Sequence, residues 1–172
     1  MLPTTSEPPA IRPAFDLIDH HGRAVDLTAF RGSFVLVFFG FTHCRVVCPR
    51  ALKKLSSALE ALDEDPTQLI ALYITVDPER DTPQVMRAFL ETYPRILGLT
   101  GSRDQIEIAK RNFRVFSRRS ASPTEDGNYD VPHTAMTYLL DPEGRYIAHF
   151  NDSLDLPEFI ERLRIGLTEG GR

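Results

Sequence analysis

The sequence predicts an α/β domain in which helices cover both faces of a mixed β-sheet. Two continuous apolar runs, residues 34–41 and 68–77, have the length and the β-branched and aromatic content of buried strands, and each is followed by a segment with helical periodicity. Two further strand patterns joined by a short turn follow within 134–150, and a helical pattern closes the chain. This order of elements is typical of layered α/β domains.

One domain accounts for the chain apart from its first residues. With 172 residues and 42% apolar side chains, the chain can bury one substantial core. Residues 1–12 are rich in Pro, Thr and Ser and are predicted to be a disordered linker, which leaves 13–172 as the domain. The linker lacks the basic and apolar segments of a signal peptide, and the run at 34–41 is too short to span a bilayer.

The charge balance argues against nucleic acid as a partner. The formal net charge is −4, and no dense basic run occurs along the chain. A nucleic-acid-binding domain would be expected to carry a basic patch or stripe. We therefore predict no nucleic-acid partner.

The first half of the domain contains a hairpin, a strand and a helix. Residues 15–27 predict two short strands around a His-Gly turn, and residues 34–41 predict a buried strand. A helix is expected from Pro49 onward, because apolar residues then recur at three- and four-residue steps. These residues are Leu52, Leu55, Leu59 and Leu62.

The middle of the chain predicts a second buried strand and two helices. After the strand at 68–77, either Asp81 or Thr82 could cap a helix with Pro83 in its first turn. A third helix is predicted over 102–113. The apolar face of the helix that follows Pro83 comprises Val85, Met86, Phe89, Leu90 and Tyr93.

The last third predicts a polar loop, a hairpin and a closing helix. Residues 117–132 form the loop, and strands at 134–141 and 145–150 are joined by a turn. The closing helix carries Leu156, Phe159, Ile160, Leu163 and Leu167 on one face. The complete order of elements suggests a thioredoxin-like fold.

Both cysteines of the chain, Cys44 and Cys48, lie where the strand at 34–41 runs into the following helix. The free N–H groups and the dipole at the start of a helix favour a thiolate there. Four residues span one helical turn, about 6 Å between Cα atoms, which suits either a disulfide or two sulfur ligands of one metal ion. The alternative is that both cysteines are small buried apolar residues of the helix.

Two thiolates leave most metal sites incomplete, so a histidine is expected as a third ligand. His20 and His21 fall in a predicted turn, His43 should point away from the sulfurs, and His149 should face outward from an edge-like strand. His133 lies at the mouth of a core strand, where open α/β sheets place their sites. It is either the third ligand or a loop histidine bonded to the backbone.

Three segments together resemble the Sco/SenC family of thioredoxin-like copper chaperones, which help to assemble the copper centre of cytochrome c oxidase. They are FFGFTHCRVVCP, TVDPERDTP and VPHTAMTYLLDPEGR, and the likeness extends over about residues 14–168. The resemblance implies that Cys44, Cys48 and His133 bind copper as Cu(I) or Cu(II). Thiolates favour Cu(I), and imidazole suits both oxidation states.

The resemblance also implies partners and a location. The partners would be the copper-binding subunit of cytochrome c oxidase, other copper chaperones and thiol reductants. An N-terminal membrane anchor, missing from this sequence, would hold the domain on the periplasmic face of a bacterial inner membrane or in the mitochondrial intermembrane space.

The sequence departs from the family pattern around the implied ligands. Arg45 and Val46 stand where the family has Pro and Asp, and Pro132 stands where the family has Asp before the histidine. Residues next to metal ligands tune affinity and redox potential. These three positions therefore bear on copper affinity and on the choice of partner.

Two enzymatic alternatives use the same cysteines. In a thiol-disulfide oxidoreductase, Cys44 would attack a substrate disulfide and Cys48 would resolve the mixed disulfide, with His133 taking no part. A peroxidase-like reductase would need polar groups around one reactive sulfur, and the sequence offers no separate set for that role. Three intervening residues instead of two favour metal binding.

Overall fold

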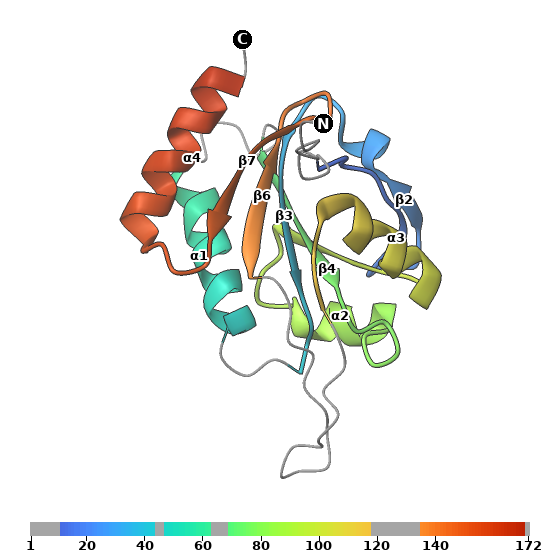
Figure 1. Ribbon diagram of the computed structural model, residues 1–172. Coiled ribbons are helices and arrows are strands. Elements are labelled where there is room, and N and C mark those ends of the chain that lie inside the picture. Colours follow the sequence, from blue (N-terminus) through green and yellow to red (C-terminus); the bar gives the residue numbers. More distant parts are fainter. Residues whose placement is uncertain (1–10, 44–46, 63–68, 118–134, 171–172) are drawn as a thin grey trace, which may run out of the picture.

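The computed structural model describes residues 11–43, 47–62, 69–117 and 135–170, which form a layered α/β domain (Figure 1). The strands are β1 Asp16–Asp19, β2 Ala24–Asp26, β3 Phe34–Gly40, β4 Leu69–Thr75, β5 Ile96–Thr100, β6 Met136–Leu140 and β7 Tyr146–Asn151. The helices are α1 Val47–Ala61, α2 Pro83–Phe89, α3 Arg103–Phe113 and α4 Leu156–Gly170, with a 3₁₀ turn at Leu27–Phe30.

One mixed sheet of seven strands organises these elements, in the order β2-β1-β5-β4-β3-β6-β7. Strands β3, β4 and β5 are parallel, whereas β1 and β6 pair antiparallel to β5 and β3. Helices α1 and α4 cover one face, and α3 covers the other (Figure 1). The predicted fold class, a mixed sheet flanked by helices with an N-terminal hairpin, is confirmed.

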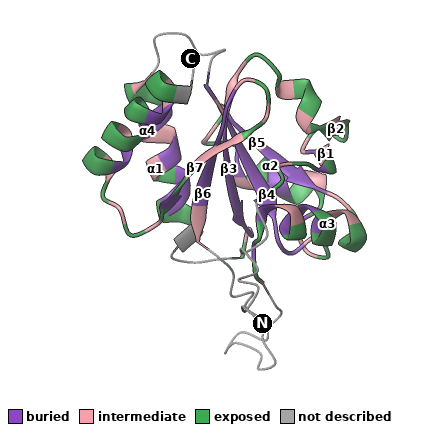
Figure 2. Cartoon of the chain, turned by 45° about the horizontal axis from the view of Figure 1, so that its top comes forward, coloured by how far each residue is buried: buried purple, intermediate pink, exposed green. Residues whose placement is uncertain are grey.

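Strand β3 is buried on both faces, as its uninterrupted apolar sequence predicts (Figure 2). Leu36 and Phe38 point into the core cluster that includes α1 and α4, and Val37 and Phe39 point into the cluster that includes α3. Burial of these side chains contributes about 2 kcal/mol each. The carboxyl end of β3 is therefore held by packing from both sides.

Strand β5 was missed by the sequence analysis, although it lies inside the sheet between β1 and β4. Its apolar run is only five residues long and contains Gly98. A Cβ at Gly98 would lie 2.7 Å from Leu90 Cδ1 and 3.3 Å from His20 Nδ1. The glycine that weakens the strand pattern is thus required by close packing in the fold.

Two helix boundaries differ from the prediction. Helix α1 begins at Val47, two residues before Pro49, and α2 ends at Phe89, so that Tyr93 lies beyond it. Of the two predicted caps for α2, Thr82 has the role, because its side chain accepts from the N–H of Val85.

His20 has a structural contact that its predicted place in a surface turn did not reveal. The regular pairing of β1 with β5 ends at Asp19 and Leu99. At the next position the N–H of Gly98 donates to His20 Nδ1 at 2.9 Å, so a side chain continues the ladder. His21 is exposed, as expected.

The bond from Gly98 makes the stability of the domain depend on the charge of His20. Partial burial lowers the pKa of His20 below its ordinary value of 6.5, His21 and Arg87 act in the same direction, and Asp19 opposes them. Folding therefore favours the neutral ring, and this contribution is complete above pH 6.5 and is lost as the pH falls through the lower pKa of the folded state.

We expect His20→Ala to lower the free energy of unfolding at neutral pH by about 1 kcal/mol. The difference between wild type and variant should shrink on acidification below pH 6.5, because protonation already removes the acceptor in the wild type. Urea unfolding at several pH values measures both quantities. A difference that is constant with pH would contradict this account.

Candidate metal site at the carboxyl ends of strands β3 and β4

The predicted ligands meet the described structure only in part. Cys44 and His133 lie outside the described residues, as do Arg45, Val46 and Pro132, and Cys48 is described only as the second residue of α1. Because β3 ends at Gly40 and α1 begins at Val47, the two cysteines do fall across a strand-to-helix junction. Within the described ranges, no group of three or more His, Cys, Asp or Glu side chains could hold a metal ion.

Asp81 is the centre of a buried hydrogen-bond network at this end of the sheet. Its side-chain Oδ2 accepts from Thr42 N–H at 3.0 Å and from Thr75 Oγ1 at 2.7 Å, and its Oδ1 accepts from Thr42 Oγ1 at 2.5 Å. Its backbone carbonyl accepts from Thr100 Oγ1 at 2.6 Å. One residue that is 0% exposed thus joins the ends of β3, β4 and β5.

From the sequence, only a role as a helix cap is predicted for Asp81. Its actual role depends on Thr42, which is 39 residues away in the chain. One signal for this role was present in the sequence. Thr82 alone is enough to cap α2, so the carboxylate of Asp81 is left for another partner. Burial raises the pKa of Asp81, the hydrogen bonds from Thr42 and Thr75 act against that rise, and nearby Asp77 adds to it.

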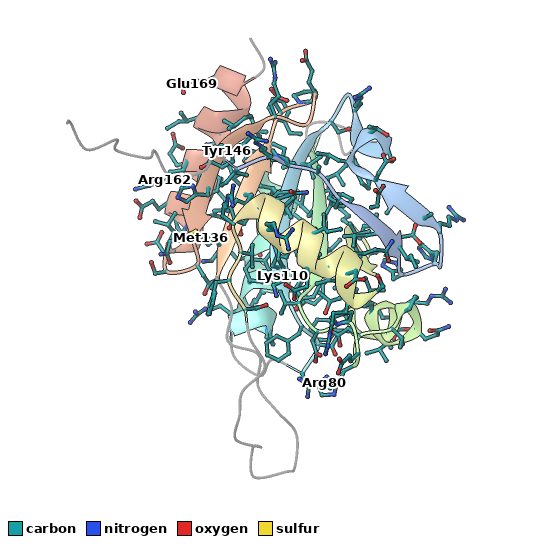
Figure 3. The ribbon with its side chains drawn as sticks, turned by 45° about the vertical axis from the view of Figure 1, so that its right-hand side comes forward. Arg80, Lys110, Met136, Tyr146, Arg162 and Glu169 are labelled. Carbon is teal, nitrogen blue, oxygen red and sulfur yellow. The ribbon has the colours of Figure 1, made fainter. Side chains whose placement is uncertain are left out.

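An ion pair between the half-buried Arg80 and the buried Asp77 lies beside this network. Arg80 Nε donates to Asp77 Oδ2, and the guanidinium of Arg80 lies 5.9 Å from the centre of the Phe41 ring. The N–H of Asp77 donates to Thr75 Oγ1 at 2.9 Å, which connects the ion pair with Asp81. Figure 3 shows Arg80 at this end of the molecule. Phe41, which precedes the cysteine segment, thus packs against an arginine that is itself held by an ion pair.

His43 extends the network to the surface. Its Nδ1 lies 3.1 Å from Thr42 Oγ1 and 4.0 Å from Asp81 Oδ1, and its side chain is 40% exposed. It directly precedes Cys44 in the sequence. The sequence analysis treated His43 only as a residue pointing away from the sulfurs and gave it no partner.

A second set of contacts holds the start of α1 against the turn after β7. Arg50 donates to the Asp152 carboxylate at 2.5 Å, and Lys54 Nζ donates to the carbonyl oxygens of Asp152 and Leu154 at 2.7 and 2.6 Å. The N–H of Asp152 donates to Ala135 O at 3.2 Å, two residues after the predicted histidine ligand. Helix α1 and the start of β6 are thus fixed relative to each other.

The remaining histidine, His149, lies on the edge strand and is exposed, as predicted. Its Nδ1 is hydrogen-bonded to the hydroxyl of Tyr146. Burial raises the pKa of the neighbouring Tyr138 to about 12, so that phenol stays protonated at neutral pH. The cluster extends from the edge strand β7 to β6, where Tyr138 is paired with Val37 of β3.

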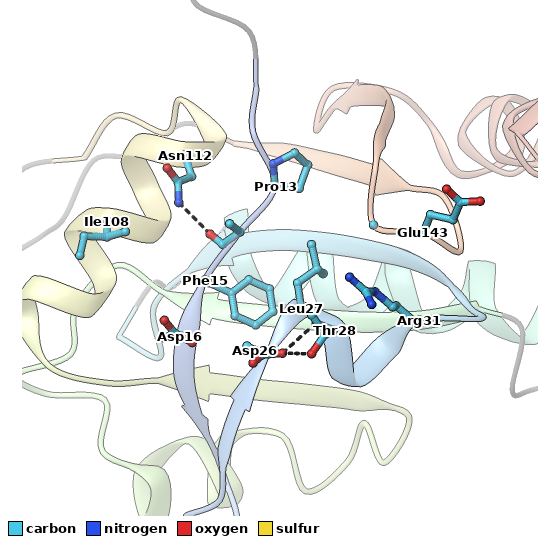
Figure 4. A pocket seen from close by; sticks show the side chains of 12 residues that line it. Pro13, Phe15, Asp16, Asp26, Leu27, Thr28, Arg31, Ile108, Asn112 and Glu143 are labelled. Carbon is cyan, nitrogen blue, oxygen red and sulfur yellow. Dashed lines mark hydrogen bonds between the residues drawn. The ribbon is translucent and has the colours of Figure 1, made fainter.

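A cavity of about 380 Å³ lies at the opposite end of β3, beside the turn of β6 and β7 (Figure 4). Three of its polar side chains, those of Asp26, Thr28 and Asn112, have hydrogen-bond partners within the lining. Asp26 accepts from the N–H and hydroxyl of Thr28, and Asn112 Nδ2 donates to Ala14 O at 3.0 Å.

Comparisons with known proteins find relatives that match most of this chain. The SCO1/SenC family profile matches residues 3–167. A SCO2-like protein of Rickettsia prowazekii is 38% identical over 148 residues, which cover 86% of this chain and 72% of the relative. A mitochondrial SCO2 homologue of Danio rerio is 40% identical over 153 residues, which cover 87% of this chain and 54% of that protein.

A solved structure gives the same result for the fold. ScoI of Bradyrhizobium japonicum, determined with copper bound, superposes with a TM-score of 0.81 at 38% identity and covers 92% of this chain and 100% of its own. The thioredoxin-like fold predicted from the order of elements is that of these proteins.

We expect Asp81→Ala to lower the free energy of unfolding by about 3 kcal/mol, because three donors lose a buried acceptor. Glu91→Ala, which removes an exposed carboxylate, should change it by less than about 0.5 kcal/mol. Urea denaturation monitored by circular dichroism compares the two variants. Equal, small losses in both would show that Asp81 does not hold the strand ends together.

Proposed function

The chain belongs to the SCO1/SenC family, and from this we propose that it is a copper metallochaperone that supplies the copper centre of cytochrome c oxidase. The observation that carries the proposal is the pair of cysteines across the junction of β3 and α1, in a chain similar to a ScoI solved with copper bound. Copper is the cargo of the protein in this proposal, bound through Cys44, Cys48 and His133.

The donor set suits copper on chemical grounds. Thiolates favour Cu(I), imidazole suits both oxidation states, and three ligands leave a position open for exchange. Two thiolates and one neutral imidazole carry a charge of about −2, so the loaded site is near neutral with Cu(II) and about −1 with Cu(I). Cys48 is the second residue of α1, and the first turn of a helix has free backbone N–H groups that can stabilise a thiolate.

The contacts of the described residues support an ordered frame for these ligands. Asp81 holds the strand that leads into Cys44, and Asp152 joins the first turns of α1 to the segment after His133. A binding site is more precise when the elements that lead to its ligands are held by packing and hydrogen bonds.

The partners and the location follow from the same proposal. The acceptor is the copper-binding subunit of cytochrome c oxidase, and copper donors and thiol reductants serve the chaperone itself. We place the domain on the outer face of a bacterial inner membrane or in the mitochondrial intermembrane space, held by an N-terminal anchor. Within the described part of the chain, no helix is long and apolar enough to cross a membrane.

A thiol-disulfide oxidoreductase is the second candidate, because the fold puts Cys48 in the first turn of a helix that follows a central strand. In that case Cys44 would attack a substrate disulfide and Cys48 would release the product. The two functions differ in their need for His133, which metal binding requires and disulfide exchange does not.

We expect the reduced protein to bind one copper ion, with a strong sulfur-to-Cu(II) absorption band in the cupric form. Cys44→Ser and Cys48→Ser should each abolish the band, and His133→Ala should weaken binding by about tenfold or more, because each change removes a ligand. Copper titration with metal analysis and absorption spectra measures these effects.

His149→Ala is the matched control for this series, since it removes an exposed histidine on the edge strand β7. Its copper affinity and spectrum should equal those of the wild type. An unchanged affinity in His133→Ala would exclude His133 as the third ligand. Disulfide exchange that survives in His133→Ala while copper binding is absent from the wild type would favour the oxidoreductase.

We also expect a Cys44–Cys48 disulfide to block copper uptake, because the bond consumes both thiolates that the metal needs. Protein oxidised until mass spectrometry shows the loss of two protons should take up no copper, and reduction should restore binding of one ion. Equal copper content in the oxidised and reduced proteins would contradict this prediction.

A further inference from the structure

The hydrogen bonds around Thr42 fix which nitrogen of His43 carries the proton. A threonine hydroxyl has one proton to donate. Thr42 donates that proton to Asp81 Oδ1 at 2.5 Å, so its contact of 3.1 Å with His43 Nδ1 needs a proton from the ring. In the neutral ring this places the proton on Nδ1 and leaves Nε2 with a free lone pair.

The direction of this relay is set by Asp81. Thr75 Oγ1 accepts from Asp77 N–H at 2.9 Å and therefore directs its own proton to Asp81 Oδ2 at 2.7 Å. The N–H of Thr42 can only donate, and it also reaches Oδ2, at 3.0 Å. Three donors on two oxygens stabilise the ionised carboxylate, which then accepts the hydroxyl proton of Thr42.

A histidine that binds a metal ion through one ring nitrogen commonly donates with the other to a hydrogen-bonded partner. Here Nδ1 donates to the Thr42 hydroxyl, which in turn donates to the Asp81 carboxylate. Within the described part of the chain, Nε2 of His43 has no hydrogen-bond partner, and the side chain is 40% exposed. The neighbouring residue in the sequence is Cys44, a proposed copper ligand.

We propose that His43 Nε2 is a transfer ligand, which holds copper briefly as the ion enters or leaves the site of Cys44, Cys48 and His133. This role rests on the proposed copper chaperone function. During loading, a bond between copper and Nε2 forms as a bond to the donor breaks, and it breaks in turn as the bonds to sulfur form. No proton leaves His43, because Nε2 carries none, and the oxidation state of copper does not change.

The first experiment measures the tautomer of His43 in the reduced, metal-free protein, by long-range ¹H–¹⁵N correlation NMR at neutral pH. The wild type should show the proton on Nδ1. In Asp81→Asn the amide NH₂ would face Thr42 Oγ1, so the hydroxyl would donate to His43 Nδ1 and the proton would move to Nε2. Thr42→Val, which keeps the buried carboxylate, should lose the fixed Nδ1 proton if Asp81→Asn does not fold. A proton on Nε2 in the wild type would overturn the proposal.

The second experiment measures the rate of copper loading, by rapid mixing of reduced protein with Cu(II) and detection of the sulfur-to-copper band. His43→Ala should load about ten times more slowly than the wild type. Asp81→Asn should load equally slowly although it keeps His43. The double variant with both changes should be no slower than either single variant, because each change removes the same free lone pair on Nε2. His21→Ala, an exposed histidine of the β1–β2 turn, should load at the rate of the wild type.

The two failures are distinguishable. A wild type that binds no copper would overturn the proposed function and the transfer role with it. A wild type with the expected copper spectrum, together with an unchanged loading rate in His43→Ala, would overturn the transfer role alone.

Discussion

The buried carboxylate of Asp81 is the interaction on which the end of the sheet depends. Three parallel strands end side by side here, and each leaves backbone and hydroxyl groups that need partners away from water. Asp81 supplies acceptors to Thr42, Thr75 and Thr100 through its side chain and its backbone carbonyl. The chain can therefore leave β3 toward the cysteine segment from a fixed starting point.

Packing also holds the strand that leads to this end of the sheet. The side chains of β3 alternate between two core clusters, so the strand cannot shift toward either layer of helices without opening a cavity. Helix α1 is held by polar contacts instead, which Arg50 and Lys54 make with the turn at Asp152. The two elements that flank the cysteine segment are therefore each held by contacts of their own.

The sequence was sufficient for the elements whose local pattern agrees with their environment. β3 and β4 are uninterrupted apolar runs, and α3 carries a capping box between Ser102 and Gln105. β5 was missed because Gly98, required by its contacts with Leu90 and His20, breaks the strand pattern. The hydrogen bonds of Asp81 and His20 were missed because their partners are distant in the sequence, and only the fold brings them together.

A carboxylate at the buried position 81 calls for an explanation, because burying a charge is unfavourable. An apolar side chain of similar volume often stabilises a buried position at least as well as an ion does. What an apolar residue cannot do is accept protons from Thr42 and Thr75 at once and so set the direction of the bond to His43. A neutral amide could fill the space but would reverse that direction. The stability of the strand ends and the tautomer of an exposed imidazole next to Cys44 therefore depend on the same charged group.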